Sequence, residues 1–535
     1  MEKKGEGPGK FSLSVGGKKM TSPLGAEGSA WMWQIAGKVS VKNLKTVIKL
    51  HDLTGFDGRC DAIYFTTEVG KMPPSDVKEL EAFRRQALGL PDEAPVAGEY
   101  DLVVVGAGIA GMSAAVSAAR LGCRVALIND RPVVGGNNSS EIRVHLGGRI
   151  EEGTYKELGG LQKEFGPEKG GNAQPAEYYE DQKKMDWLAG EKNVSLFLNF
   201  RAIGVTKEGD KITSVIVKHI ESGKELKFEA PLFSDCTGDG TIGYLAGADY
   251  RMGREGRDEY GESIAPEKAD KLTMGSSVQW YSVDNKKSSP FPEFGYGVEF
   301  NDKNCEKVMM GEWTWETGMN FDQIKDFERI RDYGMLVVYS NWSYLKNRMK
   351  ENDQYKNRKL GWVAYVAGKR ESRRLMGDYI LKEDDITKNV SHEDASFATT
   401  WSIDLHWQDP KNSEHFPGNE FKAVTKHILI HPYAVPYRCL YSRNVDNLFM
   451  AGRNISVTHV ALGTVRVMRT TGMMGEVVGM AASLCKKYDV TPRGVYRSHL
   501  EDLKTLMKEG VNKKGLPNNQ RYNEGGMLKD KPVVQ

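Results

Sequence analysis

The stretch Leu102-Val103-Val104-Val105-Gly106-Ala107-Gly108-Ile109-Ala110-Gly111 decides the fold. Its four leading apolar residues predict a buried strand, and the small residues that follow the glycines predict a helix. Gly106 suits a tight turn, Gly108 lets the backbone approach a pyrophosphate, and Gly111 lets helix and strand pack closely. A strand, a glycine turn and a helix in this order predict a dinucleotide-binding unit.

The next predicted strand, Val125 to Ile128, tests this reading because such a strand normally ends in a carboxylate that binds a ribose. The carboxylate is expected about twenty residues after the glycines, and Asn129 stands 129 − 111 = 18 positions after Gly111. Asparagine can hydrogen-bond ribose hydroxyls, and Asp130 can supply the charge one step further. In the alternative interpretation, Asn129 only caps the turn after the strand.

The segment Arg131 to Ser140 (RPVVGGNNSS) indicates which dinucleotide is bound. It follows the strand with two glycines and a cluster of amide and hydroxyl groups. An NAD site does not need such a loop, whereas the pyrophosphate and ribityl chain of FAD run past the first unit and need a second cradle. The sequence therefore predicts FAD.

Three later segments carry a resemblance to a known family. They are Asp235 to Gly240 (DCTGDG), Asn447 to Ser456 (NLFMAGRNIS), and His459 to Val467 (HVALGTVRV) with the helix-like run after it. Together with the first motif they resemble the FAD-dependent oxidoreductases related to the flavoprotein subunits of fumarate reductase and heterodisulfide reductase. The WTWETG and GKRESRR segments also resemble those of a subgroup often described as xanthan lyases.

The resemblance implies an α/β fold. We expect a Rossmann-type, glutathione-reductase-like FAD-binding domain with an inserted α+β substrate domain and a small N-terminal β segment. It also implies a helix, after the last glycine turn, whose N-terminus faces the flavin. The implied FAD-binding residues are Gly106, Gly108, Ile109, Ala110, Gly111, Asn129, Asp130, Arg131, Gly135, Gly136, Asn137, Ser139, Ser140, Ala202, Thr237, Gly238, Asp239, Gly452, Arg453, Gly463, Thr464 and Val465.

Changes of pattern along the chain predict its domains. Residues 1–70 alternate polar and apolar residues in short runs, as in a partial, carbohydrate-binding-like β-sandwich. A charged helix and a proline-containing linker fill 71–99. The FAD-binding domain is expected at 100–248 and 427–487, the inserted substrate domain at 249–426, and a C-terminal helix and tail at 488–535.

The candidate catalytic residues lie in the insertion and beside the last motif. Arg370 and Arg373 (GKRESRR) could bind a carboxylate or oxyanion, or Glu371 could pin the insertion to the FAD domain. His406 shares one face of a predicted strand with Asp404, and a carboxylate beside an imidazole raises its basicity. His145, His431 and His459 complete the set of candidate histidines, and His459 is expected nearest the flavin. We expect no metal site, because no cysteines are spaced as ligands.

These residues lead to a mechanistic hypothesis. A histidine takes a hydroxyl proton while a hydride leaves the substrate carbon for the flavin. The substrate is expected to be a carbohydrate or hydroxy acid, as a small molecule or an oligosaccharide, and the electron acceptor is unknown. Alternatives are an electron-transfer flavoprotein subunit, an enoate reductase and, with least support, a polysaccharide lyase.

Aromatic residues leave two interpretations open. Trp31 and Trp33 could form a sugar-stacking platform or could pack in a core. Trp313 and Trp315, in WTWETG, could stack on a sugar or cover the flavin, or could be buried.

Overall composition excludes other classes of partner. The 535 residues include 74 basic and 72 acidic ones, so no global field attracts nucleic acid, and no apolar run predicts a membrane span. We see no export signal in the opening residues. The sequence therefore leaves the compartment undetermined: periplasmic for a shortened chain, otherwise cytoplasmic.

Overall fold

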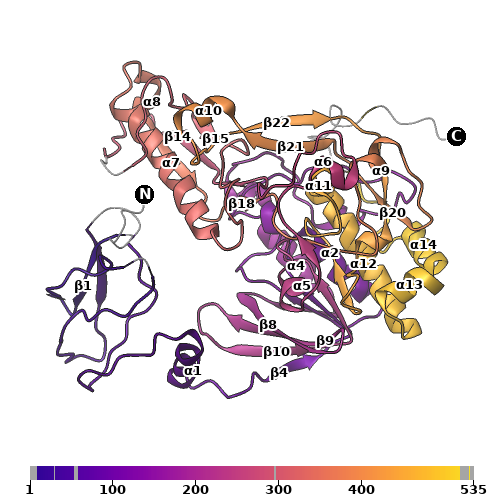
Figure 1. Cartoon of the computed structure of the whole chain (residues 1–535), viewed down its shortest axis with the longest axis horizontal. Helices are drawn as coiled ribbons and strands as arrows, with labels where there is room; N and C mark the ends of the chain where they lie inside the picture. The colour runs from indigo at the N-terminus through magenta and orange to yellow at the C-terminus, as the bar shows by residue number, and fades with distance from the viewer. Residues whose placement is uncertain (1–8, 29, 54–57, 294–296, 519–528, 530–535) are drawn as a thin grey trace. The chain divides into compact units, whose positions relative to one another are not determined.

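A computed structural model describes residues 9–28, 30–53, 58–293, 297–518 and 529, and the chain divides into two compact units (Figure 1). Unit 1 consists of Met1–Glu93 with Glu293–Val298. Unit 2 consists of Ala94–Pro292 and Glu299–Gln535. It contains the complete glycine motif and all candidate catalytic residues.

Unit 1 is built on one antiparallel sheet in the order β2-β1-β3, with β1 Phe11–Val15, β2 Lys18–Lys19 and β3 Ile48–Asp52. The polar–apolar alternation of β1 places Leu13 in a small core with Met20 and Leu24. The similar run at 37–41 is not a strand. Helix α1, Val77–Ala87, confirms the predicted charged helix, and the Asp76 side chain caps it by accepting from the backbone N–H groups of Lys78 and Glu79.

Unit 2 is organised around a five-stranded parallel sheet in the order β24-β11-β5-β6-β7. The strands are β5 Leu102–Val105, β6 Val125–Ile128, β7 Val194–Phe197, β11 Leu232–Asp235 and β24 Leu448–Met450. All four residues of β5 are buried, because parallel strands are covered on both faces. The Rossmann-type fold predicted from the glycine motif is therefore confirmed.

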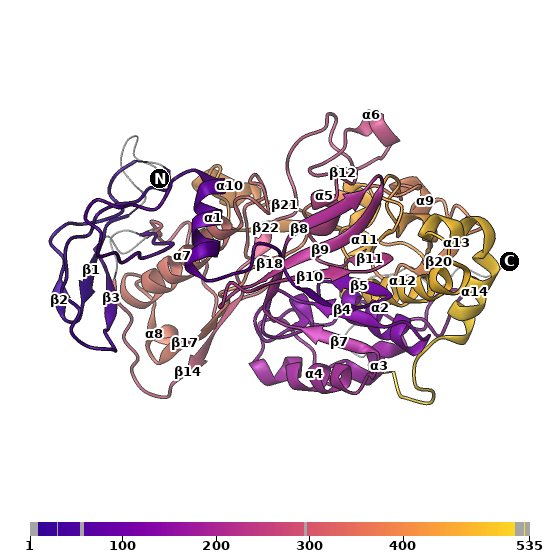
Figure 2. The same cartoon turned by 90° about the horizontal axis from the view of Figure 1, so that it is seen from below.

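A second sheet, in the order β4-β10-β9-β8, combines a strand that precedes β5 with three strands that follow β7. It contains β4 Val96–Glu99, β8 Phe200–Glu208, β9 Lys211–His219 and β10 Glu225–Glu229 (Figure 2). The chain then returns to the parallel sheet through β11. This order brings residues 235–240 directly after a strand that lies beside β5.

Two helices made of small residues pack closely in the core of unit 2. Helix α2, Ile109–Arg120, contacts α12, Met468–Tyr488, along its length. A side chain at Gly475 would meet the Ala110 carbonyl oxygen at 2.1 Å, so glycine is required for this approach. Helix α4, Asp181–Ala189, contacts β7, and α5, Thr241–Leu245, contacts β8 and β11, whereas α3 Leu161–Phe165, α13 Pro492–Ser498 and α14 Leu500–Glu509 contact α12. Within the described residues after α12, up to 518, the chain thus forms two short helices.

The insertion between β11 and β24 consists of short strands around one long helix. That helix is α7, Phe327–Asn347, drawn in salmon in Figure 1. The strands are β12 Tyr250–Arg251, β13 Ser276–Ser277, β14 Trp280–Asp284, β15 Met310–Gly311, β16 Glu316–Thr317, β17 Arg358–Val363, β18 Gly368–Lys369, β19 Arg374–Leu375, β20 Ala395–Ala398, β21 Ile403–Gln408, β22 Ala423–Ile428 and β23 Ala434–Pro436. The other α-helices of the insertion are α6 Arg257–Tyr260, α8 Asp353–Lys356, α9 Glu383–Thr387 and α10 Pro410–His415, while α11 His459–Val465 follows β24. No helix in the described part of the chain has the length and apolar character that a membrane span needs.

Candidate active site

The glycine turn between β5 and α2 leaves the start of the helix open. Gly106 has φ +102°, and a side chain there would meet the Cys236 carbonyl oxygen at 2.3 Å. Gly108 is the N-cap of α2 and makes no side-chain cap, while the nearest atom to a Cβ there is 3.9 Å away. Free N–H groups and the helix dipole at such an end favour an anion, as a pyrophosphate requires.

The second predicted loop lies directly beside this turn. Gly108 and Gly135 form a parallel bridge, and the Gly135 N–H donates to the Ala107 carbonyl at 2.8 Å. Gly135 and Gly136 both have positive φ and lead into a 3₁₀ turn at Gly136–Asn138. Two glycine-rich segments that are about thirty positions apart in the sequence thus form one continuous cradle.

Lys184 binds the backbone of the second loop. The side chain is fully buried in α4, and its ammonium donates to the Asn138 carbonyl at 2.6 Å and to the Tyr179 carbonyl. Burial lowers the pKa of Lys184 to about 8, although nearby Asp181 and Glu180 oppose this shift. The buried ammonium therefore holds the Asn138 end of the loop and the Tyr179 carbonyl together by hydrogen bonds.

We expect Lys184→Met to destabilise the protein by about 2–3 kcal/mol, because two buried carbonyls lose their donor. Urea unfolding measures this loss. Gln182→Met, at an exposed position of the same helix, is the matched control, and equal losses in the two variants would refute this role of Lys184.

Asn129 lies at the end of β6, where its side chain is bound by the backbone. Its Oδ1 accepts from the Ala107 N–H at 3.2 Å, and its Nδ2 donates to the Arg131 and Val133 carbonyls at 3.2 and 2.8 Å. Both amide hydrogens are thus used within the loop. The contact between Asn129 and a ribose stays a prediction, and this geometry favours the exposed Asp130 for that contact.

The DCTGDG segment brings Asp239 to a cluster of positive charges. Its carboxylate accepts from Lys369 at 2.5 Å, from Arg453 at 2.9 Å and from Ser372 at 2.8 Å. Burial opposes the ionisation of Asp239, yet Lys369 and Arg453 hold its pKa well below the ordinary value. Asp239 thus connects the turn that contains Thr237 and Gly238 to two other segments. Lys369 and Ser372 belong to the insertion, and Arg453 belongs to the segment 447–456.

His459 forms a buried dyad with a carboxylate. It is the first residue of α11, is 3% exposed, and donates from Nδ1 to Glu371 at 2.9 Å. A carboxylate accepts only, so Nδ1 carries the hydrogen and the neutral ring has its lone pair on Nε2. Within the described part of the chain, Nε2 has no hydrogen-bond partner. The ring is therefore oriented as a general base.

Further charges hold this dyad in place. Arg374 is fully buried and binds both Glu371 and Glu255, and Glu255 accepts the backbone N–H of His459 at 2.8 Å. Burial raises the pKa of Glu371, but the positive charges of Arg374 and of His459 in its protonated form outweigh it and keep this pKa below the ordinary value. Glu371 is thus an anion that stabilises a protonated His459.

His406 is held on both of its ring nitrogens. Its Nδ1 contacts Glu316 at 2.6 Å, and its Nε2 contacts Arg466 at 3.0 Å and Asp404 at 3.3 Å. Burial opposes ionisation of Glu316, but Arg370 and His406 lower its pKa to about 2. Both ring nitrogens of His406 therefore have partners. This arrangement suits a residue that connects the insertion to α11 better than it suits a catalytic base.

The other predicted residues are distributed around these two clusters. Arg370 donates to Ser277 at 2.9 Å and lies 3.5 Å from Glu316, whereas Arg373 stacks over Tyr244 at 3.8 Å, outside both clusters. His431 is half-buried, and its Nδ1 lacks a partner among the described residues.

The expected last glycine turn is instead part of a helix. Gly463, Thr464 and Val465 lie buried in α11, where Gly463 allows contact with the backbone of Asp404. Backbone N–H groups at the start of α11 already have acceptors, because the Thr458 side chain accepts from the Ala461 N–H and Glu255 accepts from the His459 N–H. The following helix, α12, has no side-chain cap at Val467, and the N–H of its second residue, Arg469, donates to the Gly147 carbonyl at 2.9 Å. That the N-terminus of α12 faces the flavin stays a prediction.

Sequence reasoning missed several members of these clusters. Glu316 and Arg374 stand inside the WTWETG and GKRESRR segments, so a closer reading of those segments could have suggested them. Glu255 lies 204 positions from His459, and no local pattern indicates it. Trp315 is buried against Trp280, as in the core interpretation, whereas half-buried Trp313 packs against His406.

Glu262 is a further buried carboxyl beside α11. Its Oε1 accepts from Thr458 at 2.6 Å and from the Glu383 N–H at 2.9 Å, while its Oε2 has no partner among the described residues. Burial raises the pKa of Glu262 from 4.5 to about 7. A folded-state pKa above the unfolded value means that the contribution to stability is complete below pH 4.5 and is lost as the pH rises to 7.

We therefore expect Glu262→Gln to flatten the fall in stability between these pH values. The difference between wild type and variant should change by roughly 3 kcal/mol across this window. Urea unfolding at several pH values measures it, and parallel curves for the two proteins would rule out this assignment.

The residues present fit FAD. Besides the two glycine turns, the loops that face them contain buried polar atoms without a partner in the described structure: Asn138 Oδ1, Ser139 Oγ, Arg453 Nε and Asn454 Oδ1. A phosphate, a ribityl chain and a flavin ring offer complementary groups. None of the described His, Cys, Asp and Glu residues form a group that could bind a metal. Fold and site together define a flavin-dependent oxidoreductase.

Comparison with known proteins supports the same class of enzyme. The family model described as FAD dependent oxidoreductase matches residues 101–507. The chain belongs to the FAD dependent oxidoreductase family, and FAD is its cofactor. A search of curated protein sequences gives no significant match.

Solved structures show distant similarity. The geranylgeranyl bacteriochlorophyll reductase-like protein of Thermoplasma acidophilum is 14% identical, with 77% of this chain and 83% of that chain covered and a TM-score of 0.32. The Mycobacterium smegmatis Sdh1 complex in the apo form is 12% identical, with 78% and 77% covered and a TM-score of 0.31. L-proline dehydrogenase from P. horikoshii is 14% identical, with 77% and 60% covered and a TM-score of 0.26.

Proposed function

We propose that the enzyme is a dehydrogenase that oxidises a hydroxyl-bearing small molecule or oligosaccharide, either a carbohydrate or a hydroxy acid. When bound, FAD supplies the acceptor for a hydride at its N5 atom. The substrate loses that hydride from carbon and a proton from oxygen, and becomes a ketone or aldehyde. The electron acceptor that later reoxidises the cofactor is not assigned.

The observation that supports this proposal is the His459–Glu371 dyad. Nε2 of His459 takes the hydroxyl proton, and the Glu371 carboxylate stabilises the imidazolium that forms. Arg374 and Glu255 hold both groups in position. We assign the base to His459 and a positioning role to His406, whose ring nitrogens are both occupied.

The experiment is anaerobic mixing of the FAD-loaded enzyme with a panel of sugars, uronic acids and hydroxy acids. We expect at least one compound to bleach the flavin absorbance and to yield the matching carbonyl product. If none bleaches it, while dithionite-reduced enzyme is reoxidised by an unsaturated acid, the enzyme is a reductase and the proposal fails.

A further inference from the structure

Positive charge is concentrated in the N-terminal sheet of unit 1. Residues 9–53 contain seven lysines and two acidic residues, Glu27 and Asp52, whereas the whole chain has a net charge of only +2. A local excess of this kind attracts anions in a way that the balanced remainder of the chain does not.

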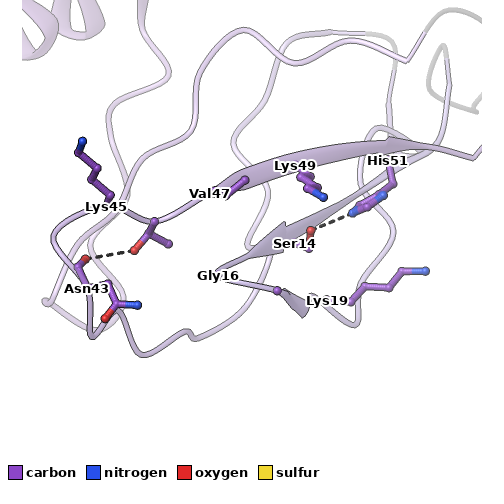
Figure 3. Close-up of a pocket in the computed structure, with 10 residues that line it drawn as sticks. Ser14, Gly16, Lys19, Asn43, Lys45, Val47, Lys49 and His51 are labelled. Atoms are coloured by element: carbon purple, nitrogen blue, oxygen red, sulfur yellow. Dashed lines mark hydrogen bonds between the residues drawn. The ribbon is translucent and has the colours of Figure 1, made fainter.

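Strand register gathers part of this charge on one face of the sheet. Ser14 of β1 pairs with Lys19 of β2 on one side and with Lys49 of β3 on the other. Residues opposite one another share a face, and His51, two positions after Lys49, lies on that face too. These side chains, together with Asn43, Lys45 and Thr46 of the loop before β3, line one pocket, the lysine hollow (Figure 3).

The three lysines are not used to hold the fold. The opposite face of β1 packs Leu13 into the small core, while Lys19, Lys45 and Lys49 are exposed. None of the three forms an ion pair with a residue that the structure describes, and no acidic side chain lines the hollow. Their charges are therefore available to a ligand.

The rest of the lining suits a polyhydroxylated ligand. The Ser14 hydroxyl and the His51 Nε2 lie 2.9 Å apart, and Thr46 and Asn43 add a hydroxyl and an amide. A volume of about 590 Å³ is within the range of ligand pockets. The lining has no Trp, Tyr or Phe on which a nucleobase could stack.

We infer that this lysine hollow binds an acidic oligosaccharide, whose carboxylates or sulfates contact Lys19, Lys45 and Lys49 while its hydroxyls contact the Ser14, Thr46 and Asn43 groups. Such a site would hold the enzyme on a charged glycan. The inference does not depend on the proposed reaction of unit 2.

Calorimetric titration of the full chain tests this site with an oligogalacturonate, a sulfated heparin tetrasaccharide and a neutral maltotetraose. We expect one or both acidic sugars to bind, with affinity that falls as salt rises, and the neutral sugar to bind at least about tenfold more weakly. Which acidic sugar binds more tightly identifies carboxylate or sulfate as the preferred group. A DNA oligonucleotide and phosphatidylserine vesicles serve as other polyanions. Equal binding of either, or no binding of both acidic sugars, would overturn the inference.

Two triple variants distinguish sugar binding in the hollow from a general effect of positive charge. Replacing Lys19, Lys45 and Lys49 with serine should weaken sugar binding at least about tenfold, whereas the same change at Lys18, Lys38 and Lys42, which removes equal charge outside the hollow, should not. Equal losses would refute the site. Lysine acetylation of the wild-type chain, read by mass spectrometry, checks the result without mutation, because the sugar should protect the first three lysines alone.

Discussion

Replacing His459 with alanine is expected to slow the reduction of bound FAD by substrate by about 10²–10⁴-fold, the usual contribution of a positioned base. The reason is that Nε2 is the unoccupied nitrogen of a ring whose Nδ1 is held by Glu371 at 2.9 Å. FAD content should stay at the wild-type level. Anaerobic stopped-flow measurement of flavin absorbance gives the rate.

Two further variants make this prediction specific. Glu371→Gln keeps an acceptor for Nδ1 but removes the charge, so the loss of rate should be smaller and the pH profile of flavin reduction should shift. His415→Ala, at an exposed histidine of α10, should reduce the flavin at the wild-type rate. A His459→Ala enzyme as fast as this control would dismiss the dyad as the base.

Replacing Gly111 with valine should abolish FAD binding. A Cβ at this position would lie 1.7 Å from the Gly106 carbonyl oxygen, so the turn that holds the pyrophosphate could not form. The purified variant should be colourless, and FAD released by denaturation should fall from about one per chain to a trace.

Gly190→Val is the matched control for added bulk. Gly190 lies after α4 with a negative φ, and the nearest atom to a Cβ there is 3.4 Å away. Far-UV circular dichroism shows whether each variant is folded. A folded Gly111→Val protein with a full complement of FAD would contradict the assigned nucleotide site.

The Rossmann-type part of the fold could be predicted because its signal is local. The strand, glycine turn and helix at 102–120 follow one another within a single unit, and steric contacts such as that of Gly111 permit few other residues. The sequence of the insertion contains no comparable local motif. Its strands β13, β16 and β18 have two residues each, too few for any periodicity, and only tertiary contacts bring them together.

The candidate site was predictable in part for the same reason. Asp404 and His406 share a strand face, so their proximity follows from the period of two. The choice between His406 and His459 as base does not follow from sequence. It depends on which ring nitrogens are occupied: Arg466 contacts Nε2 of His406, whereas Glu371 holds only Nδ1 of His459, and the fold brings both partners from distant segments.

Asn129 shows the limit of motif reasoning at one residue. Its position after β6 matches that of a ribose ligand, but its amide hydrogens bind the Arg131 and Val133 carbonyls instead. The sequence specifies a polar residue at this place, while the path of the loop determines what that residue binds.

The substrate deuterium isotope effect on flavin reduction tests the central claim most directly. Once the panel identifies a substrate, a single turnover is followed at saturating concentration with hydrogen or deuterium on the carbon that carries the hydroxyl. If His459 and FAD together remove a proton and a hydride, deuterium on that carbon should slow the bleaching of bound FAD several-fold, by about two- to sevenfold. Equal rates for the two substrates would show that this C–H bond is not broken in the step that reduces the flavin, and would contradict the account.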